Sequence, residues 1–278
     1  LSTCVTFGVY VPTIAATLLI ARALNWNDRL ILIALALTCF AAINFTQTTH
    51  LVRQYVSASI AYFAFANFLC GRRGWAIIAA LVAATIHNAS ALVIANVAAW
   101  ACLVPYRLAI PRVSSVIRVA GAALFSVLTV LALAVNELAV LGIPNENISA
   151  FHYLITALLF VAFSYGARST VEGSAKYYIT SAIISIWTLS LVLFVLGFAS
   201  TALRFFSYLE WLFPMMAVAV LCLVPRKHVG LYVVSRFSAV SLALLLFAFR
   251  LHYSPWSYGP IGGDILFVNI RELANQVR

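Results

Sequence analysis

The sequence predicts an all-α, polytopic membrane protein with about nine or ten transmembrane segments. Hydrophobic residues make up 64% of the 278 residues, and charged residues make up only 9%. A water-soluble domain carries about 25% charged residues, because charges cover its surface. With so few charges, the outer surface of this chain is expected to face hydrocarbon. Strands of a membrane barrel would alternate polar and apolar side chains, whereas the runs 31–37 and 242–249 are continuously apolar.

Apolar segments, most of them close to the roughly 20 residues that a membrane-spanning helix needs, follow one another along the chain. They fall at about residues 3–21, 30–46, 55–71, 75–104, 117–136, 151–167, 177–198, 206–224 and 231–250. No soluble insertion or repeat separates them, so residues 1–278 are predicted to form a single transmembrane domain. Because the chain begins at Leu1 without a charged leader, we expect that an N-terminal segment precedes it.

The segment 75–104 is predicted to be a hairpin of two short helices. Its middle, residues 85–90, reads TIHNAS and interrupts the apolar run. One long helix would place basic residues on both sides of the membrane, Arg72 before it and Arg107 after it, against the positive-inside bias. A turn near His87 returns both to the cytoplasm. Asn88 and Ser90 are expected to cap the second helix.

Counting the hairpin as two segments places most of the positive charge on the cytoplasmic side. Twelve of the seventeen Lys and Arg residues would lie there: Arg22, Arg29, Arg72, Arg73, Arg107, Arg112, Arg118, Arg168, Lys176, Arg226, Lys227 and Arg236. The loop 137–150 carries two acids and no base, which fits the outer side, and both ends of this chain would then lie outside. The net charge of +10 therefore reflects membrane loops, and no nucleic-acid partner is expected.

Three polar residues remain on the opposite, outer side of the predicted topology. Arg53 and Arg204 would begin helices there, and His87 would occupy the hairpin tip. A charged side chain near the membrane core costs about 2.5–3.5 kcal/mol and usually has a function. The alternative for Arg53 is a side chain that snorkels to the interface. The alternative for Arg204 is a structural pair with Glu210, although six residues place the two on different helix faces.

Other candidates surround these three residues. His87 either handles a proton or bonds a main-chain carbonyl within a helix turn. Glu210, the only acid within a predicted span, either serves as a general base or has a structural partner. Gln54 follows Arg53, and Tyr208 lies one turn after Arg204, which makes both candidate substrate-binding residues.

Several kinds of chemistry are excluded by the absence of their motifs. The sequence contains no P-loop, GxSxG, HExxH or paired-acid metal motif. The five cysteines lie in apolar stretches without a CxxC pair, so neither zinc nor a disulfide framework is indicated. We expect no cofactor and no metal. A transferase whose donor carries a lipid diphosphate remains compatible, because it needs only cations for the diphosphate and one base for the acceptor.

The stretch 44–103 resembles the EpsG-like, Wzy-type bacterial polysaccharide polymerases, which make O-antigen or exopolysaccharide. It carries Arg-Gln at a helix start, a basic break at residues 72–73, and a helix that ends in Ile-His at residues 86–87. A second, shorter match is residues 204–208, which read RFFSY. Two positions depart from the family pattern, since Ala89 stands where Ser is common and Ser57 stands where Ala is usual.

The resemblance implies polymerisation of undecaprenyl-diphosphate-linked oligosaccharide units at the outer face of the bacterial inner membrane. Arg53, Gln54, Arg204 and Tyr208 would bind substrate, and His87 and Glu210 would be catalytic. The expected partners are the lipid-diphosphate-linked oligosaccharide, membrane lipids and other polysaccharide-assembly proteins.

Two other functions stay open. A transporter or flippase for lipid-linked sugars could use the same arginines to capture an anionic headgroup. Such transporters often have matched broken helices in two halves, and here only 75–104 is predicted to be broken. A membrane glycan ligase or acyltransferase would share the lipid-facing chemistry.

Overall fold

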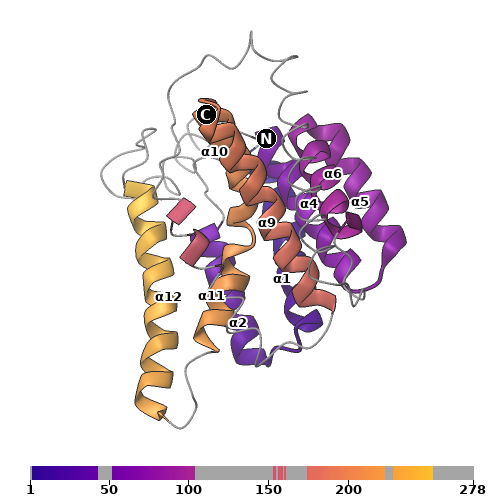
Figure 1. Ribbon diagram of the computed structural model, residues 1–278. Coiled ribbons are helices and arrows are strands. Elements are labelled where there is room, and N and C mark those ends of the chain that lie inside the picture. The colour runs from indigo at the N-terminus through magenta and orange to yellow at the C-terminus, as the bar shows by residue number, and fades with distance from the viewer. Residues whose placement is uncertain are drawn as a thin grey trace, which may run out of the picture.

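The computed structural model of the chain describes residues 2–42, 52–103, 153–154, 156–158, 160, 174–222 and 228–252. Every regular element in these ranges is a helix, which confirms the all-α prediction for this part of the chain (Figure 1). The helices are α1 (Ser2–Ala23), α2 (Asp28–Leu37), the π-helical η1 (Thr38–Ala42), α4 (Val52–Leu69), α5 (Arg73–Ile86), α6 (Asn88–Leu103), α9 (Ser174–Val195), α10 (Ala199–Glu210), α11 (Phe213–Leu221) and α12 (Val229–His252). The predicted segment 117–136, the loop 137–150 and most of 151–167 lie outside the described residues.

Three helices end in the same left-handed cap. Asn25, Gly71 and Gly197 have φ angles of 53°, 74° and 88° and follow α1, α4 and α9. At Gly71 the next N–H reaches back five residues, from Arg72 to the carbonyl of Asn67, at 2.9 Å. This pattern satisfies carbonyls that the helix end would leave unpaired. The chain therefore turns sharply after each of these helices.

Helices α1 and α4 pack side by side and run parallel. The hydroxyl of Ser59, in the first half of α4, donates to the carbonyl of Gly8 at 3.1 Å. At the other end of the pair, the thiol of Cys70 donates to the carbonyl of Leu19 at 3.5 Å. The start of α4, with Arg53, therefore lies at the opposite end of the bundle from the end of α1, with Arg22.

The predicted break in 75–104 is present at a single residue. His87 has φ −151° and ψ 124°, an extended conformation between α5 and α6. Ile77 of α5 and Ala98 of α6 both line one cavity of about 390 Å³. In one continuous helix these residues would be separated by about 30 Å along the axis. The chain therefore folds back at His87.

The predicted segment 206–224 is wrong as a single helix. It contains two helices, α10 and α11, bent by 46° at the break after Glu210. Pro214 explains the break, because proline has no N–H to donate to the carbonyl four residues earlier and its ring clashes with that carbonyl. Helix α10 also begins earlier than predicted, so Arg204 lies within α10 rather than at its start.

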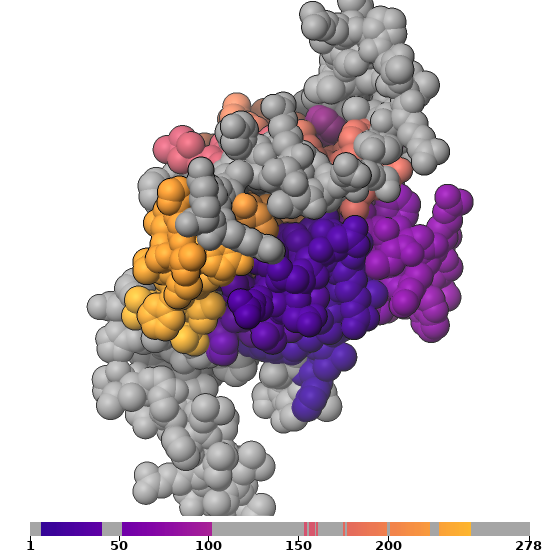
Figure 2. Space-filling view, turned by 90° about the horizontal axis from the view of Figure 1, so that it is seen from below, coloured from indigo at the N-terminus to yellow at the C-terminus, as the bar shows by residue number. Residues whose placement is uncertain are grey.

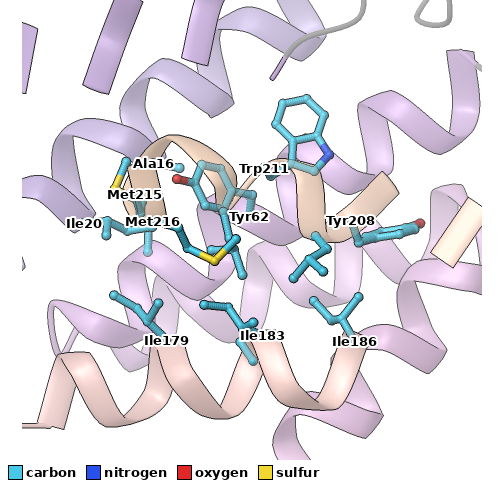
Figure 3. Packing of buried hydrophobic residues seen from close by; sticks show 14 of the residues in the cluster. Ala16, Ile20, Tyr62, Ile179, Ile183, Ile186, Tyr208, Trp211, Met215 and Met216 are labelled. Atoms are coloured by element: carbon cyan, nitrogen blue, oxygen red, sulfur yellow. The ribbon is translucent and has the colours of Figure 1, made fainter. Parts of the chain in front are cut away.

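The core joins α1, α4, α9, α10 and α11. Figure 3 shows Ile179, Ile183 and Ile186 along one face of α9, pointing towards Tyr62 and Met216. The spacing of three and four residues places them on one helix face. This packing holds α9 and the α10–α11 break against α4.

Large apolar side chains also cover the outside of the bundle. On α5, Trp75 and Ile77 are 63% and 60% exposed, and on α12 Phe237 is 73% exposed. Helix α12 and the α5–α6 pair lie at opposite sides of the described helices (Figures 1 and 2). Polar side chains such as Asn67 and Asn96 are instead buried and bonded to main-chain carbonyls, at 2.8 and 3.0 Å.

Among the described helices, Tyr177–Val195 is long and apolar enough to cross a membrane. A second span is present if the bent pair Thr201–Glu210 and Phe213–Leu221 counts as one. Shorter apolar helices occupy Phe7–Ala23, Arg73–Ile86, Asn88–Ala101 and Val229–Leu245.

Candidate functional site

The first turn of α4 is fastened to α10 by one side chain. The amide nitrogen Nε2 of Gln54 donates to the main-chain oxygen of Arg204 and to Oγ of Ser207, both at 2.9 Å. Gln54 is buried, with 3% of its surface exposed. Both of its N–H donors are thus satisfied in a place where an unmet donor would be costly. Gln54, predicted to bind substrate, uses both side-chain N–H donors to join the two arginine-bearing helices.

Three buried hydroxyl groups join α4, α6 and α10. Ser57 Oγ lies 2.6 Å from the carbonyl oxygen of Ala83 and also bonds Ser90 Oγ, which in turn lies 2.7 Å from Tyr208 Oη. Ser57 and Ser90 are fully buried, and Tyr208 is 5% exposed. We call Ser57, Ser90 and Tyr208 the hydroxyl chain.

The Ser57 hydroxyl is placed to donate to two acceptors, the carbonyl oxygen of Ala83 and Oγ of Ser90. It has a single proton, which these two acceptors share. Between Ser90 and Tyr208 either hydroxyl can be the donor. Tyr208 can therefore donate to Ser90 or accept from it.

His87 caps the helix that follows it. The imidazole Nδ1 of His87 accepts the main-chain N–H of Ala89 at 3.3 Å. The main-chain N–H of His87 donates to the carbonyl of Ala83 at 3.2 Å. The predicted capping by Asn88 and Ser90 is wrong, because Asn88 is an exposed helical residue and Ser90 belongs to the hydroxyl chain. With Nδ1 accepting, a neutral imidazole carries its proton on Nε2.

Arg53 and Arg204 extend from neighbouring positions on the two helices that Gln54 joins. Both side chains are exposed, and neither forms an ion pair or a side-chain hydrogen bond within the described ranges. The acids of these ranges are Asp28 and Glu210. Asp28 begins α2, at the opposite end of the bundle. This end of the bundle therefore presents two guanidinium groups beside the His87 turn.

Glu210 lies further along α10. It is half-buried at the last position of the helix, about 9 Å along the axis from Arg204. The hydrogen bonds between α4, α6 and α10 pass through Gln54 and the hydroxyl chain, and Glu210 follows them at the break. The structure thus gathers Arg53, Gln54, His87, Arg204 and Tyr208 at one end of the bundle and places Glu210 deeper.

The sequence analysis did not predict that serines connect these residues, since it named Ser57 and Ser90 for other reasons and did not name Ser207. Ser57, Ser90 and Ser207 each lie three or four residues after a predicted site residue, namely Arg53, His87 and Arg204. In a helix this spacing puts both side chains on one face. The sequence offered one signal for these contacts. Three times, a predicted site residue is followed by a serine three or four residues later.

Metal chemistry finds no support in the described part of the chain, where no group of three or more His, Cys, Asp or Glu side chains gathers. No protein-family model, curated protein or solved structure matches this sequence. The resemblance of residues 44–103 to the Wzy-type polymerases therefore remains a prediction from those residues.

Proposed function

We propose that the chain is a multi-pass protein of the bacterial inner membrane that polymerises lipid-diphosphate-linked oligosaccharide units at the outer face. A hydroxyl oxygen of the incoming unit forms a bond to the anomeric carbon of the growing glycan. The bond from that carbon to the diphosphate breaks, and the lipid diphosphate leaves with the electron pair. The proton of the hydroxyl passes to a basic group or to the leaving diphosphate.

The observation that carries the proposal is the pairing of Arg53 and Arg204 by Gln54. A diphosphate offers several anionic oxygens, and each guanidinium can bind two of them in a planar fork. Within the described residues, the two exposed guanidinium groups form no ion pair, which keeps their donors available for such a ligand. Charge that develops on the leaving diphosphate would be stabilised in the same place.

His87 has a restricted part in this proposal. While Nδ1 caps α6, Nε2 carries a proton and can only donate. His87 therefore orients the acceptor sugar, or donates to a diphosphate oxygen, while the cap is intact. To act as a base at Nε2, the imidazole would have to give up the Ala89 bond.

The distribution of polar and apolar side chains supports a membrane location. The outer faces of α5 and α12 are apolar, while the buried side chains of Asn67 and Asn96 donate to main-chain carbonyls inside the bundle. The hydrocarbon of a bilayer solvates an apolar outer surface but offers no hydrogen bonds. Polar groups of a membrane protein therefore bond to one another in its interior. Arg22 and Arg72 lie at the end opposite to Arg53, in agreement with a cytoplasmic end and an outer end.

The second candidate, a flippase or transporter for the same lipid-linked sugars, gains one observation. The bend at α10–α11 is a second interrupted segment, which the sequence did not predict. Broken helices that meet at a binding site are frequent in transporters. Two members of the hydroxyl chain lie close to these breaks in sequence, Ser90 three residues after His87 and Tyr208 two residues before Glu210.

The experiment that separates the candidates uses purified protein in proteoliposomes. The substrate is the lipid-linked repeat unit isolated from the host strain. A polymerase yields a ladder of longer lipid-linked glycans together with one equivalent of lipid diphosphate for each bond. Translocation of unchanged substrate would replace the proposal by transport, and transfer to a single foreign acceptor would replace it by ligation.

A further inference from the structure

A cavity of about 390 Å³ lies between α4, α5, α6 and α9, next to the hydroxyl chain. Its volume falls within the range of about 300–1,000 Å³ in which pockets enclose small organic ligands. Arg73 is the only charged residue among the described lining residues, and the side chains of the others are hydrocarbon apart from three tyrosine hydroxyls and one indole. Such a lining offers almost nothing to a polar ligand. It fits a hydrocarbon.

Small side chains create this space. Ala76 and Ala80 on α5 face Ala98 and Ala101 on α6 across the cavity. Larger apolar residues at these positions would fill it and bury more surface. An unfilled apolar space forfeits contacts on every wall, so an apolar ligand that fills it gains them.

Tyr208 belongs to both the cavity and the candidate site. Its hydroxyl bonds Ser90 in the hydroxyl chain, while the residue itself lines the cavity together with Ile186. Figure 3 shows the Tyr208 ring near Ile186 of α9. The polar site and the apolar cavity therefore share a wall. A ligand that occupies both has a polar end beside a hydrocarbon chain.

The cavity also reaches an apolar surface of the molecule. Ile77 lines it and is 60% exposed on α5. Its neighbours on that helix, including Trp75, Ile78 and Leu81, are exposed as well. A hydrocarbon chain could enter here without crossing a polar surface, whereas a water-soluble ligand would find no polar path on this side. The exposed apolar mouth thus favours a lipid as the occupant.

The size of the cavity sets how much of a lipid it holds. Its lining runs along α4 from Ala58 to Phe68, which corresponds to about 15 Å of helix. This is roughly half of the 30 Å hydrocarbon thickness of a bilayer. Only the part of a long chain next to the headgroup would fit, and the rest would remain among the bilayer lipids.

We propose that this cavity binds the first isoprenoid units of the substrate's lipid chain and thereby places the attached phosphate groups at Arg53 and Arg204. The choice of lipid rests on the proposed function, whereas the cavity as a hydrocarbon site rests on its lining and mouth. When the lipid chain fills the cavity, it fixes the depth of the phosphate headgroup in the membrane. The lipid chain therefore helps to position the bond between the sugar and the diphosphate.

The test uses the full chain in nanodiscs and a polyprenyl phosphate that carries a photoreactive diazirine on the isoprene unit next to the phosphate and no sugar. After illumination, labelled peptides are located by mass spectrometry. Labels are expected on the inward residues of α5 and α6. Excess polyprenyl phosphate without the diazirine should reduce labelling at least about tenfold, and an equal amount of phospholipid should not.

Two plugging variants and one matched control sharpen the result. Ala80→Phe and Ala98→Phe fill the cavity from opposite walls, and each should lower labelling at least about tenfold. Ala95→Phe places the same ring at an exposed position of α6 outside the lining and should leave labelling unchanged. Even labelling over the outer faces of α5 and α12, or equal competition by phospholipid, would overturn the inference.

The outcome is independent of polymerisation, because the probe carries no sugar to transfer. If the cavity is labelled but the wild-type protein makes no polymer from the lipid-linked repeat unit, the cavity stands and the proposed function fails. If polymer is made and competition by polyprenyl phosphate leaves labelling unchanged, the cavity proposal fails alone. That competition on the wild-type protein decides the matter even where a plugging variant does not fold.

Discussion

The side-chain amide of Gln54 donates to the main-chain oxygen of Arg204 across 2.9 Å, although 150 residues separate the two in the chain. The same nitrogen bonds Ser207. Because the contact is to the main chain, it fixes the position of helix α10 and leaves the Arg204 guanidinium available to a ligand. Arg53, the residue before Gln54, is brought close by the same bond.

Replacing Gln54 is expected to separate the two arginines. Gln54→Glu puts carboxylate oxygens against the Arg204 carbonyl and removes both donors, so it should destabilise the protein by about 1–3 kcal/mol. Thermal unfolding in detergent measures the loss. Ser235→Ala, which removes a bond within a single helix, is the control and should change the melting temperature little. Equal melting temperatures for Gln54→Glu and the wild type would contradict the role given to Gln54.

The bonds of the hydroxyl chain predict an order of stabilities. Tyr208→Phe removes one of them, the bond to Ser90, so the cost should be about 1 kcal/mol. Ser57→Ala removes two, to the Ala83 carbonyl and to Ser90, at buried positions, so the cost should be about 1–3 kcal/mol. Melting temperatures in detergent should therefore fall further for Ser57→Ala. A larger fall for Tyr208→Phe would contradict this account of the hydroxyl chain.

His87→Asn tests whether the imidazole acts beyond its cap. Asparagine is a good N-cap, so the variant should fold and be expressed normally. It lacks the Nε2 proton, and polymer extension should fall at least about tenfold, since the loss of one donor aimed at the reacting groups costs roughly 10²–10³ in rate. Asn88→Ala, at the exposed neighbouring position, should extend polymer normally. Wild-type activity of His87→Asn would reduce His87 to a helix cap.

The predicted membrane orientation has a direct test in labelling with an impermeant thiol reagent. In a background without native cysteines, cysteines at positions 53, 87 and 204 should react from outside the cell. Cysteines replacing Arg29 and Arg72, at the other end of the bundle, should react only after the membrane is opened. Reaction of the Arg72 position from outside would invert the topology.

Local signals in the sequence predicted the helices better than the contacts between them. The polar residues around His87 indicated the α5–α6 break, since they interrupt an otherwise apolar run. Pro214 was an equally local signal for the α10–α11 break, but the apolar residues around it masked it in a reading based on hydrophobicity. Gly71 and Gly197 likewise end helices through their own φ angles.

The site was predictable only in part. Charge bias placed Arg53, His87 and Arg204 at one end, and the packing of α4 against α1 and α5, together with the Gln54 bonds to α10, gathers their helices there. The pairing through Gln54 and the hydroxyl chain depends on side chains 33 to 153 residues apart. Sequence spacing within one helix carries no information on such contacts. The cavity depends on how α5 and α6 pack with α4 and α9. It could not be predicted from the sequence for the same reason.

The central claim is that Arg53 and Arg204 bind a diphosphate, and the length distribution of surface polysaccharide tests it most directly. A deletion strain is complemented with the lysine and alanine variants of each arginine at matched expression. Lysine keeps the charge without the planar fork, so Arg53→Lys and Arg204→Lys should make shortened chains, and the alanine variants should make almost none. Arg72→Ala, an exposed arginine at the other end, should make chains of normal length. Long chains from Arg53→Ala and Arg204→Ala would contradict the claim and leave both residues as membrane anchors.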